Sequence, residues 1–143
     1  MNPKDFRQAY LDTIYRAAGI AFQYATEPTD FTLFDGRTFS LMTAANPRSE
    51  PFSDADNDAR NLEMRHVMEA KGWSVEPSEG VSPAGDWREP GFLIWDAPLE
   101  EVLQVGRDFG QNAVVYGTGG RIALAWCDDG ELEWFWARRA ALP

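Results

Sequence analysis

The sequence predicts an α+β fold, a two-layer sandwich in which helices cover one face of a mixed or mainly antiparallel sheet. The main observation is an order of apolar patterns. From residue 38 they read strand, helix, strand, strand, helix, strand, which is the order of a split βαβ (ferredoxin-like) unit. Two further strand patterns extend this unit by a C-terminal hairpin, and a helix pattern precedes it. A three-layer α/β arrangement would need more parallel crossovers than this chain provides.

The N-terminal third begins with the signals of a helix start. Asn2 is a residue type suited to the N-cap, and Pro3 suits the first helical position. Apolar residues then recur at helical spacing until Gly19, a typical residue for ending a helix. The Asp35-Gly36 dipeptide is a signal for a tight turn between two strands. The elements predicted here are a helix over residues 3–18 and strands over residues 20–24, 31–34 and 38–44.

The rest of the chain is divided by prolines, glycines and capping residues. Two prolines make residues 46–51 a loop, and Ser53 is expected to cap a helix that runs to about Lys71. The proline-rich residues 77–90 are expected to form a long irregular segment. The other predicted elements are a helix from about residue 96 to Gly110 and strands over residues 73–76, 91–95, 112–116, 121–127 and 131–137.

Composition limits the classes of partner. The 143 residues predict a single domain, 1–143, and carry 13 Lys and Arg against 23 Asp and Glu, a formal charge of −10. This charge repels a phosphate backbone, so general nucleic-acid binding is not expected. The longest apolar runs are far below the ~18 residues of a membrane span, and the first 18 residues lack a signal-peptide pattern. With one cysteine, these features favour the cytoplasm.

Metal and nucleophile chemistry finds little support. His66 and Cys127 are the only histidine and cysteine, and they lie in different predicted elements, so a zinc site of Cys and His is not expected. The acids around Asp56 alternate as in a calcium loop, but the central glycine and the terminal glutamate are missing. The sequence therefore predicts no metal site and no cofactor.

Polar residues at the ends of predicted elements are the remaining candidates for a site. They comprise amides, a hydroxyl, two guanidinium groups and one carboxylate. The candidates are Asn46, Ser49, Asn57, Arg60, Glu89, Arg107 and Gln111. If the sheet brings these ends together, the side chains line one pocket. The alternative is that they only shape turns and tie loops to helices.

The leading hypothesis is a pocket for a small polar or anionic ligand, such as a nucleotide or a metabolite. Arg60 and Arg107 would hold the anion, because a guanidinium group matches a phosphate or carboxylate with two parallel hydrogen bonds. Asn46 and Gln111 would recognise polar edges of the ligand. A ligand of this kind is the partner that the sequence favours most.

Two alternatives remain open. In the first, the protein is an enzyme with Glu89 as general acid or base, and burial against Phe92 and Trp87 would raise the pKa of its carboxyl. In the second, the protein is a protein-binding or stress-response accessory domain that uses the exposed aromatic side chains of the last hairpin, Trp134 and Trp136.

Four blocks of sequence carry a resemblance to a known family. The blocks are Thr43-Ala44-Ala45-Asn46-Pro47 with Ser49, Asp56-Asn57 with Arg60, Glu89-Pro90-Gly91-Phe92, and Gly106-Arg107-x-Phe109-Gly110-Gln111-Asn112-Ala113-Val114. Their order and spacing, over roughly residues 38–118, resemble the bacterial family catalogued as domain of unknown function 3293. The resemblance implies a small bacterial protein that stands alone. It supports the polar candidates and implies no particular reaction.

Overall fold

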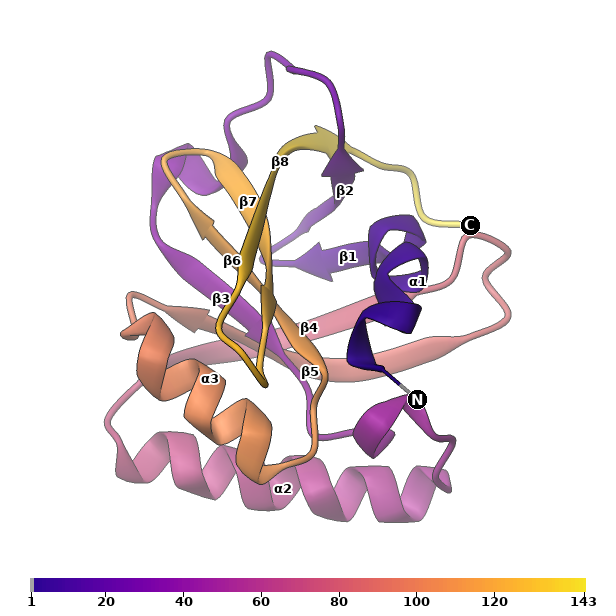
Figure 1. Ribbon diagram of the computed structural model, residues 1–143, viewed down its shortest axis with the longest axis vertical. Helices are drawn as coiled ribbons and strands as arrows, with labels where there is room; N and C mark the ends of the chain where they lie inside the picture. The colour runs from indigo at the N-terminus through magenta and orange to yellow at the C-terminus, as the bar shows by residue number, and fades with distance from the viewer. Residues whose placement is uncertain (1) are drawn as a thin grey trace.

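The computed structural model describes residues 2–143 and shows eight strands closed into a barrel (Figure 1). The strands are β1 (Ile14–Ala17), β2 (Ile20–Ala25), β3 (Phe39–Met42), β4 (Ser74–Val81), β5 (Arg88–Trp95), β6 (Ala113–Thr118), β7 (Arg121–Trp126) and β8 (Leu132–Arg139). Around the barrel they follow the order β1-β2-β8-β7-β6-β3-β5-β4, and β4 pairs with β1 to close it. Every neighbouring pair is antiparallel.

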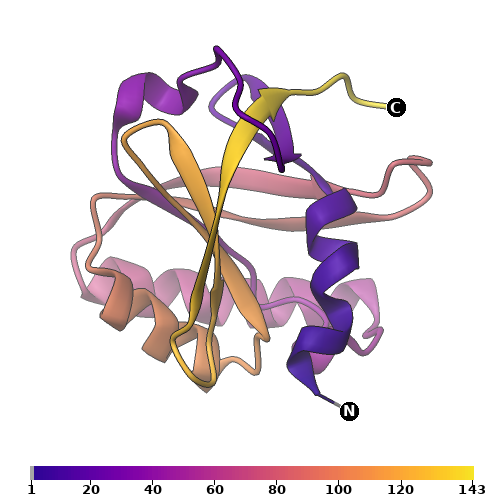
Figure 2. The same ribbon diagram turned by 45° about the horizontal axis from the view of Figure 1, so that its top comes forward.

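Helices lie on two sides of this barrel. The helices are α1 (Arg7–Asp12), α2 (Asp54–Ala70) and α3 (Leu99–Asp108), with short 3₁₀ turns η1 (Pro3–Phe6), η2 (Leu33–Gly36) and η3 (Pro47–Ser49). In both views α2 and α3 lie together along one side of the barrel, whereas α1 lies apart from them (Figures 1 and 2). No helix in the described residues is long and apolar enough to cross a membrane.

The strands bury side chains on both of their faces. Within β3, Phe39 and Leu41 belong to the cluster that fills the barrel, where they join the fully buried Trp126. Met42 belongs to a second cluster between the barrel and the helices, together with Met64 of α2. This double burial explains the continuous apolar runs of the central strands, because neither face of these strands meets water.

The predicted ferredoxin-like two-layer sandwich is wrong, because the sheet closes into a barrel. Closure depends on β1, which pairs with β2 on one side and with β4 on the other, from Ile14 opposite Val81 to Ala17 opposite Ser78. Both sides of this seam come from segments whose structure was predicted wrongly. Residues 14–17 were expected to be helical, and residues 78–81 were expected to be irregular.

The predicted helix over residues 3–18 ends early, at Asp12. Tyr15 and Ala17 belong to the barrel core and the exposed Arg16 lies between them, which is the alternation of a strand. The chain reverses at Ala18 and Gly19, where φ is +49° and +78°, and returns as β2. The apolar stripe at helical spacing was therefore partly a strand pattern.

Two other predictions also fail. Residues 31–34 form no strand, because η2 begins at Leu33 and the backbone of Phe34 is left-handed, with φ of +51°. The segment 77–90 forms most of a hairpin between β4 and β5. Two of its three prolines, Pro77 and Pro90, lie where each strand has a neighbour on only one side, which is where a sheet tolerates proline, and Pro83 lies between the strands.

The other helices and the last strands confirm the sequence interpretation. Ser53 caps α2, because its hydroxyl accepts a hydrogen bond of 3.1 Å from the backbone of Asp56. The helix α3 ends at Asp108, just before Gly110. The strands β6, β7 and β8 form the predicted meander.

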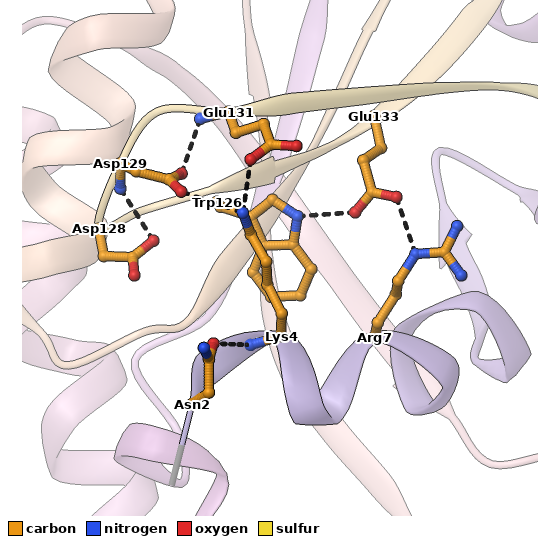
Figure 3. Close-up of polar contacts among 8 residues, drawn as sticks. All are labelled: Asn2, Lys4, Arg7, Trp126, Asp128, Asp129, Glu131 and Glu133. Atoms are coloured by element: carbon orange, nitrogen blue, oxygen red, sulfur yellow. Dashed lines mark hydrogen bonds and ion pairs between the residues drawn. The ribbon is translucent and has the colours of Figure 1, made fainter.

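Charged side chains fasten the N-terminal segment to the barrel (Figure 3). Lys4 forms ion pairs with Asp129 and Glu131, and Arg7 donates a hydrogen bond of 2.7 Å to Glu133. Although burial favours the neutral acid, hydrogen bonds from Arg7 and Trp126 hold the pKa of Glu133 below its ordinary value. These contacts fix the position of α1 against β7 and β8.

Candidate functional site

A cavity of about 660 Å³ lies between α1, the loop that contains η3, and the β4–β5 hairpin. It extends to Leu41 and Val115, which belong to the barrel core. Mouths of β-barrels are common places for ligand sites, and this volume is in the usual range for a site that takes a small molecule. Five of the seven predicted site residues line it: Asn46, Ser49, Asn57, Glu89 and Gln111.

Glu89 supplies a buried carboxyl group to the cavity. It lies on β5 opposite Gly80 of β4, and its Oε2 accepts a hydrogen bond of 2.8 Å from Nδ2 of Asn46. Burial raises the pKa of Glu89 from its ordinary value of 4.5 to about 7, and the hydrogen bond from Asn46 opposes this rise. A carboxyl with this pKa gains and loses a proton near neutral pH.

The second oxygen of Glu89 is open to the cavity. Within residues 2–143, no donor forms a hydrogen bond with Oε1, and no buried side-chain polar atom lacks a partner. Oε1 is therefore accessible from the cavity, where a ligand can reach it. One oxygen of the carboxyl is held by the protein, and the other is free to bind.

The Asn46 amide has a fixed orientation. Its Oδ1 accepts hydrogen bonds of 2.9 Å from the backbone of Phe52 and from Nδ2 of Asn57. The backbone of Asn46 donates in turn to Oδ1 of Asn57, also at 2.9 Å. Since both donors occupy Oδ1, the amide nitrogen must face Glu89. Asn57 thus acts on the site by orienting Asn46.

The loop between β3 and α2 has unusual backbone geometry. Asn46, Arg48 and Ser49 have φ values of +46°, +56° and +61°, although none of them is glycine. Such conformations cost free energy and persist where surrounding contacts hold them. Here the backbone of Arg48 donates to the carbonyl of Gly110 at 2.7 Å, and Asn112 donates to Oγ of Ser49 at 3.0 Å. This part of the cavity wall is therefore held in one shape.

Gln111 helps to hold the same wall. Its Nε2 donates a hydrogen bond of 3.0 Å to the carbonyl of Ala45, and its own backbone donates to the carbonyl of Gly106 at 2.8 Å. Gln111 thereby connects the end of α3 to the chain just before Asn46.

The two arginines of the predicted constellation lie outside the cavity lining. Arg60 donates from Nε to the carbonyl of Ala44 at 2.7 Å and from its terminal nitrogen to the carbonyl of Phe109. Arg107 donates to the carbonyl of Cys127 at 2.6 Å and to the side chain of Gln104 at 3.0 Å. Backbone and side-chain oxygens of the protein already occupy both guanidinium groups.

The aromatic residues of the lining were not predicted as site residues; they are Phe6, Tyr10, Tyr15, Phe52 and Trp87. Burial, followed by the charge of Glu89, raises the pKa of the Tyr10 hydroxyl above its ordinary value. Phe52 and Trp87 are 41% and 43% exposed, which is unusual for large apolar side chains. The position of Trp87 in the segment expected to be irregular was a usable signal, whereas that of Tyr10 became visible only with the placement of α1.

The charged residues of the lining are mostly acidic. They are Asp12, Asp54, Glu79, Glu89 and Arg88. Arg88 forms an ion pair of 2.6 Å with Glu79, so the cation of this wall already has a partner. Among residues 2–143, the cavity therefore offers no free cation to an anionic ligand.

The described residues offer less support for metal binding and for thiol chemistry. In residues 2–143, no three His, Cys, Asp or Glu side chains are grouped so that they could hold a metal ion. Burial raises the pKa of the Cys127 thiol to about 12, so it is protonated at neutral pH. In the last hairpin, Trp134 is 41% exposed and Trp136 packs beneath Arg121, and a binding role for these two residues stays a prediction.

Comparison with known proteins gave one finding. The model of the family described as "Protein of unknown function (DUF3293)" matches residues 42–114. The matched stretch contains all seven predicted site residues, whereas α1 with Tyr10 precedes it. No curated protein and no solved structure matches the chain.

Proposed function

Because the chain belongs, as its motifs indicated, to the family described as Protein of unknown function (DUF3293), whose name states no activity, we propose a function from the geometry alone. The protein binds a small polar molecule in the cavity beside Glu89. The observation that carries this proposal is the Glu89 carboxyl, which is held through Oε2 and open to the cavity through Oε1. Buried carboxyl groups in concave sites are typical recognition groups.

The geometry supports a polar ligand over an anionic one. Arg60 and Arg107, the proposed anion-binding residues, donate to oxygens of the protein, and the cavity wall carries mainly carboxylates. We therefore assign both arginines to bracing the fold. The proposal places this function in a single bacterial domain, 1–143, that works in the cytoplasm.

Blocking the cavity tests the proposal. Ala9 is an exposed residue of α1 that lines the cavity, so Ala9→Trp is expected to obstruct it without disturbing the core. Gln8→Trp adds the same side chain at an exposed position outside the lining and serves as the matched control. We expect small aromatic alcohols to shift the NMR signals of Asn46 and Glu89 in the parent and in the control, and to lose at least tenfold in affinity in Ala9→Trp. Equal binding by all three proteins would contradict the proposal.

Proton transfer by Glu89 is the second candidate function. A general acid or base works best when its pKa lies near the working pH, and the pKa of Glu89 is about 7. Tyr10, whose hydroxyl would supply a second proton in this mechanism, lines the same cavity. If Glu89 removes a carbon-bound proton, a bound substrate in heavy water exchanges that proton for deuterium, and Glu89→Gln abolishes the exchange. A substrate that is converted equally fast by Glu89→Gln would exclude this role.

A further inference from the structure

We propose that the molecule bound in this cavity is an organic cation, a protonated amine carried on an aromatic or apolar body. This inference rests on the proposed function and adds the charge and shape of the ligand to it. Three features of the cavity wall carry it: the sign of its charges, the open oxygen of Glu89 and the aromatic side chains around them.

The charges of the wall favour a cation. Asp12, Asp54 and Glu89 line the cavity without an ion pair to any residue in 2–143, and the fourth acid, Glu79, is paired with Arg88. An anionic ligand would be repelled by these carboxylates and, among the described residues, would find no free guanidinium or ammonium group there. A cationic ligand gains Coulomb attraction to the same groups, and the attraction to the largely buried Glu89 is stronger than the attraction to a carboxylate in water.

The Glu89 carboxyl lacks the donor that an ammonium group supplies. Asn46 donates one neutral hydrogen bond to Oε2, and Oε1 receives none from residues 2–143. Hydrogen bonds between an ammonium group and a carboxylate are about twice as strong as neutral ones, and an ammonium group has three donors. The raised pKa of Glu89 agrees with this reading, because it reflects burial without a compensating cation.

The ionisable neighbours of Glu89 do not supply the positive charge that its carboxylate lacks. Tyr10 faces the cavity from α1, Asp54 from the start of α2, and Glu79 and Arg88 from the hairpin that holds Glu89 itself. The acids add negative charge, and the Arg88 charge is shared with Glu79 at 2.6 Å. A positively charged ligand is the group that would balance this site.

The aromatic side chains of the lining indicate an apolar or aromatic body for the rest of the ligand. Phe6, Tyr10, Tyr15, Phe52 and Trp87 line the cavity. Aromatic rings cover apolar surface well, and their faces attract cations. The exposure of Phe52 and Trp87, 41% and 43%, is also what an apolar ligand would cover. An aromatic amine satisfies both the carboxylate and the rings.

Matched fragments of different charge test the inference. Phenethylamine, phenethyl alcohol and phenylacetate share one ring and one chain, and tryptamine, tryptophol and indoleacetate repeat the comparison with a larger ring. Dissociation constants are measured by protein-observed NMR near pH 7.5, where the shifts also report whether the fragment lies beside Glu89. We expect each amine to bind about tenfold tighter than its alcohol, and each carboxylate to bind weakest.

A pair of variants assigns the preference to Glu89. Glu89→Gln keeps the shape of the side chain and removes its charge, so it is expected to reduce the preference for the amine over the alcohol to less than about threefold while the alcohol still binds. Glu63→Gln removes the same charge from an exposed position of α2 outside the cavity lining, and it is expected to keep the full preference.

The outcomes separate this inference from the function on which it rests. Alcohols that bind as tightly as amines, carboxylates that bind tightest, or a preference that survives in Glu89→Gln would overturn the organic cation and leave small-molecule binding standing. If no fragment of any charge shifts the signals of the cavity residues, small-molecule binding in the cavity fails as well.

Discussion

Replacing Glu89 with glutamine is expected to stabilise the protein above neutral pH by about 3 kcal/mol. The native pKa of about 7 exceeds the ordinary value of 4.5, so the native protein binds more protons than the unfolded chain between these pH values. The free energy of unfolding therefore falls as the pH rises through this window, and the loss is complete above the native pKa. Each unit of pKa difference corresponds to about 1.4 kcal/mol. Glutamine is neutral at every pH and avoids the loss.

Urea unfolding at a series of pH values measures this effect. The difference in free energy of unfolding between Glu89→Gln and the parent should be small at about pH 4, grow as the pH rises through the two pKa values and level off at about pH 8. The amide oxygen of glutamine can accept the hydrogen bond from Asn46, so the variant keeps that contact. Glu63→Gln, on the exposed face of α2, should give a flat difference. A flat difference for Glu89→Gln would show that Glu89 ionises normally.

Arg60→Ala is expected to lower the free energy of unfolding by about 2–4 kcal/mol, because hydrogen bonds that involve a charged group contribute about 1.5–3 kcal/mol each. Its guanidinium group connects the carbonyls of Ala44 and Phe109, which follow β3 and α3. It also lies about midway between the Phe52 and Phe109 rings, at 5.8 and 5.9 Å from their centres. Removal leaves two carbonyls without this donor and loosens the wall behind the cavity.

Arg65→Ala is the matched control for this loss. Arg65 is an exposed residue of α2 paired with Glu69 one turn later, and such pairs contribute about 0.2–0.5 kcal/mol. Both variants are compared by urea unfolding, and fragment binding is measured on the folded protein. If Arg60→Ala left stability unchanged and abolished the binding of anions, the arginine would be a ligand-binding residue and the bracing role would be wrong.

The elements that sequence predicted well are those that carry their own local signals. The cap at Ser53, the glycine after α3 and the turns of the last meander each act within a few residues, so their positions follow from composition. The strand β1 has no such signal. It is four residues long, and Tyr10, Ile14 and Ala17 match a helical period as well as a core-facing strand.

The barrel could not be predicted because its closure is a long-range event. The seam joins residues 14–17 to residues 78–81, more than sixty positions later, and it needs both segments to be extended. Pro77 and the other prolines of that region argued against a strand, although the structure places Pro77 and Pro90 outside the three-strand part of the sheet. An error at either side of the seam turns a closed barrel into an open sheet.

For the candidate site, residue type indicated location better than it indicated role. Asn46, Asn57 and Glu89 lie at element ends, and the fold brings them together through hydrogen bonds of 2.8–2.9 Å. Arg60 also lies near the end of a predicted element, yet its long side chain reaches backbone carbonyls and stays outside the cavity. Tyr10 joins the site because α1 is fixed to the barrel, by the ion pairs of Lys4 and Arg7 and by the packing of Tyr10 against Trp126. The direction of a side chain and the packing of distant segments depend on tertiary structure, so the local sequence does not reveal them.

Cation binding beside Glu89 is tested most sharply by titrating the Glu89 carboxyl carbon by NMR, with Glu89→Gln identifying its signal. In the free protein we expect an apparent pKa of about 7. With saturating phenethylamine we expect a pKa lower by at least about one unit, because an ammonium group beside the carboxylate favours the ionised form. A carboxyl that titrates near 4.5 in the free protein, or one whose pKa does not move with the amine, would contradict these expectations.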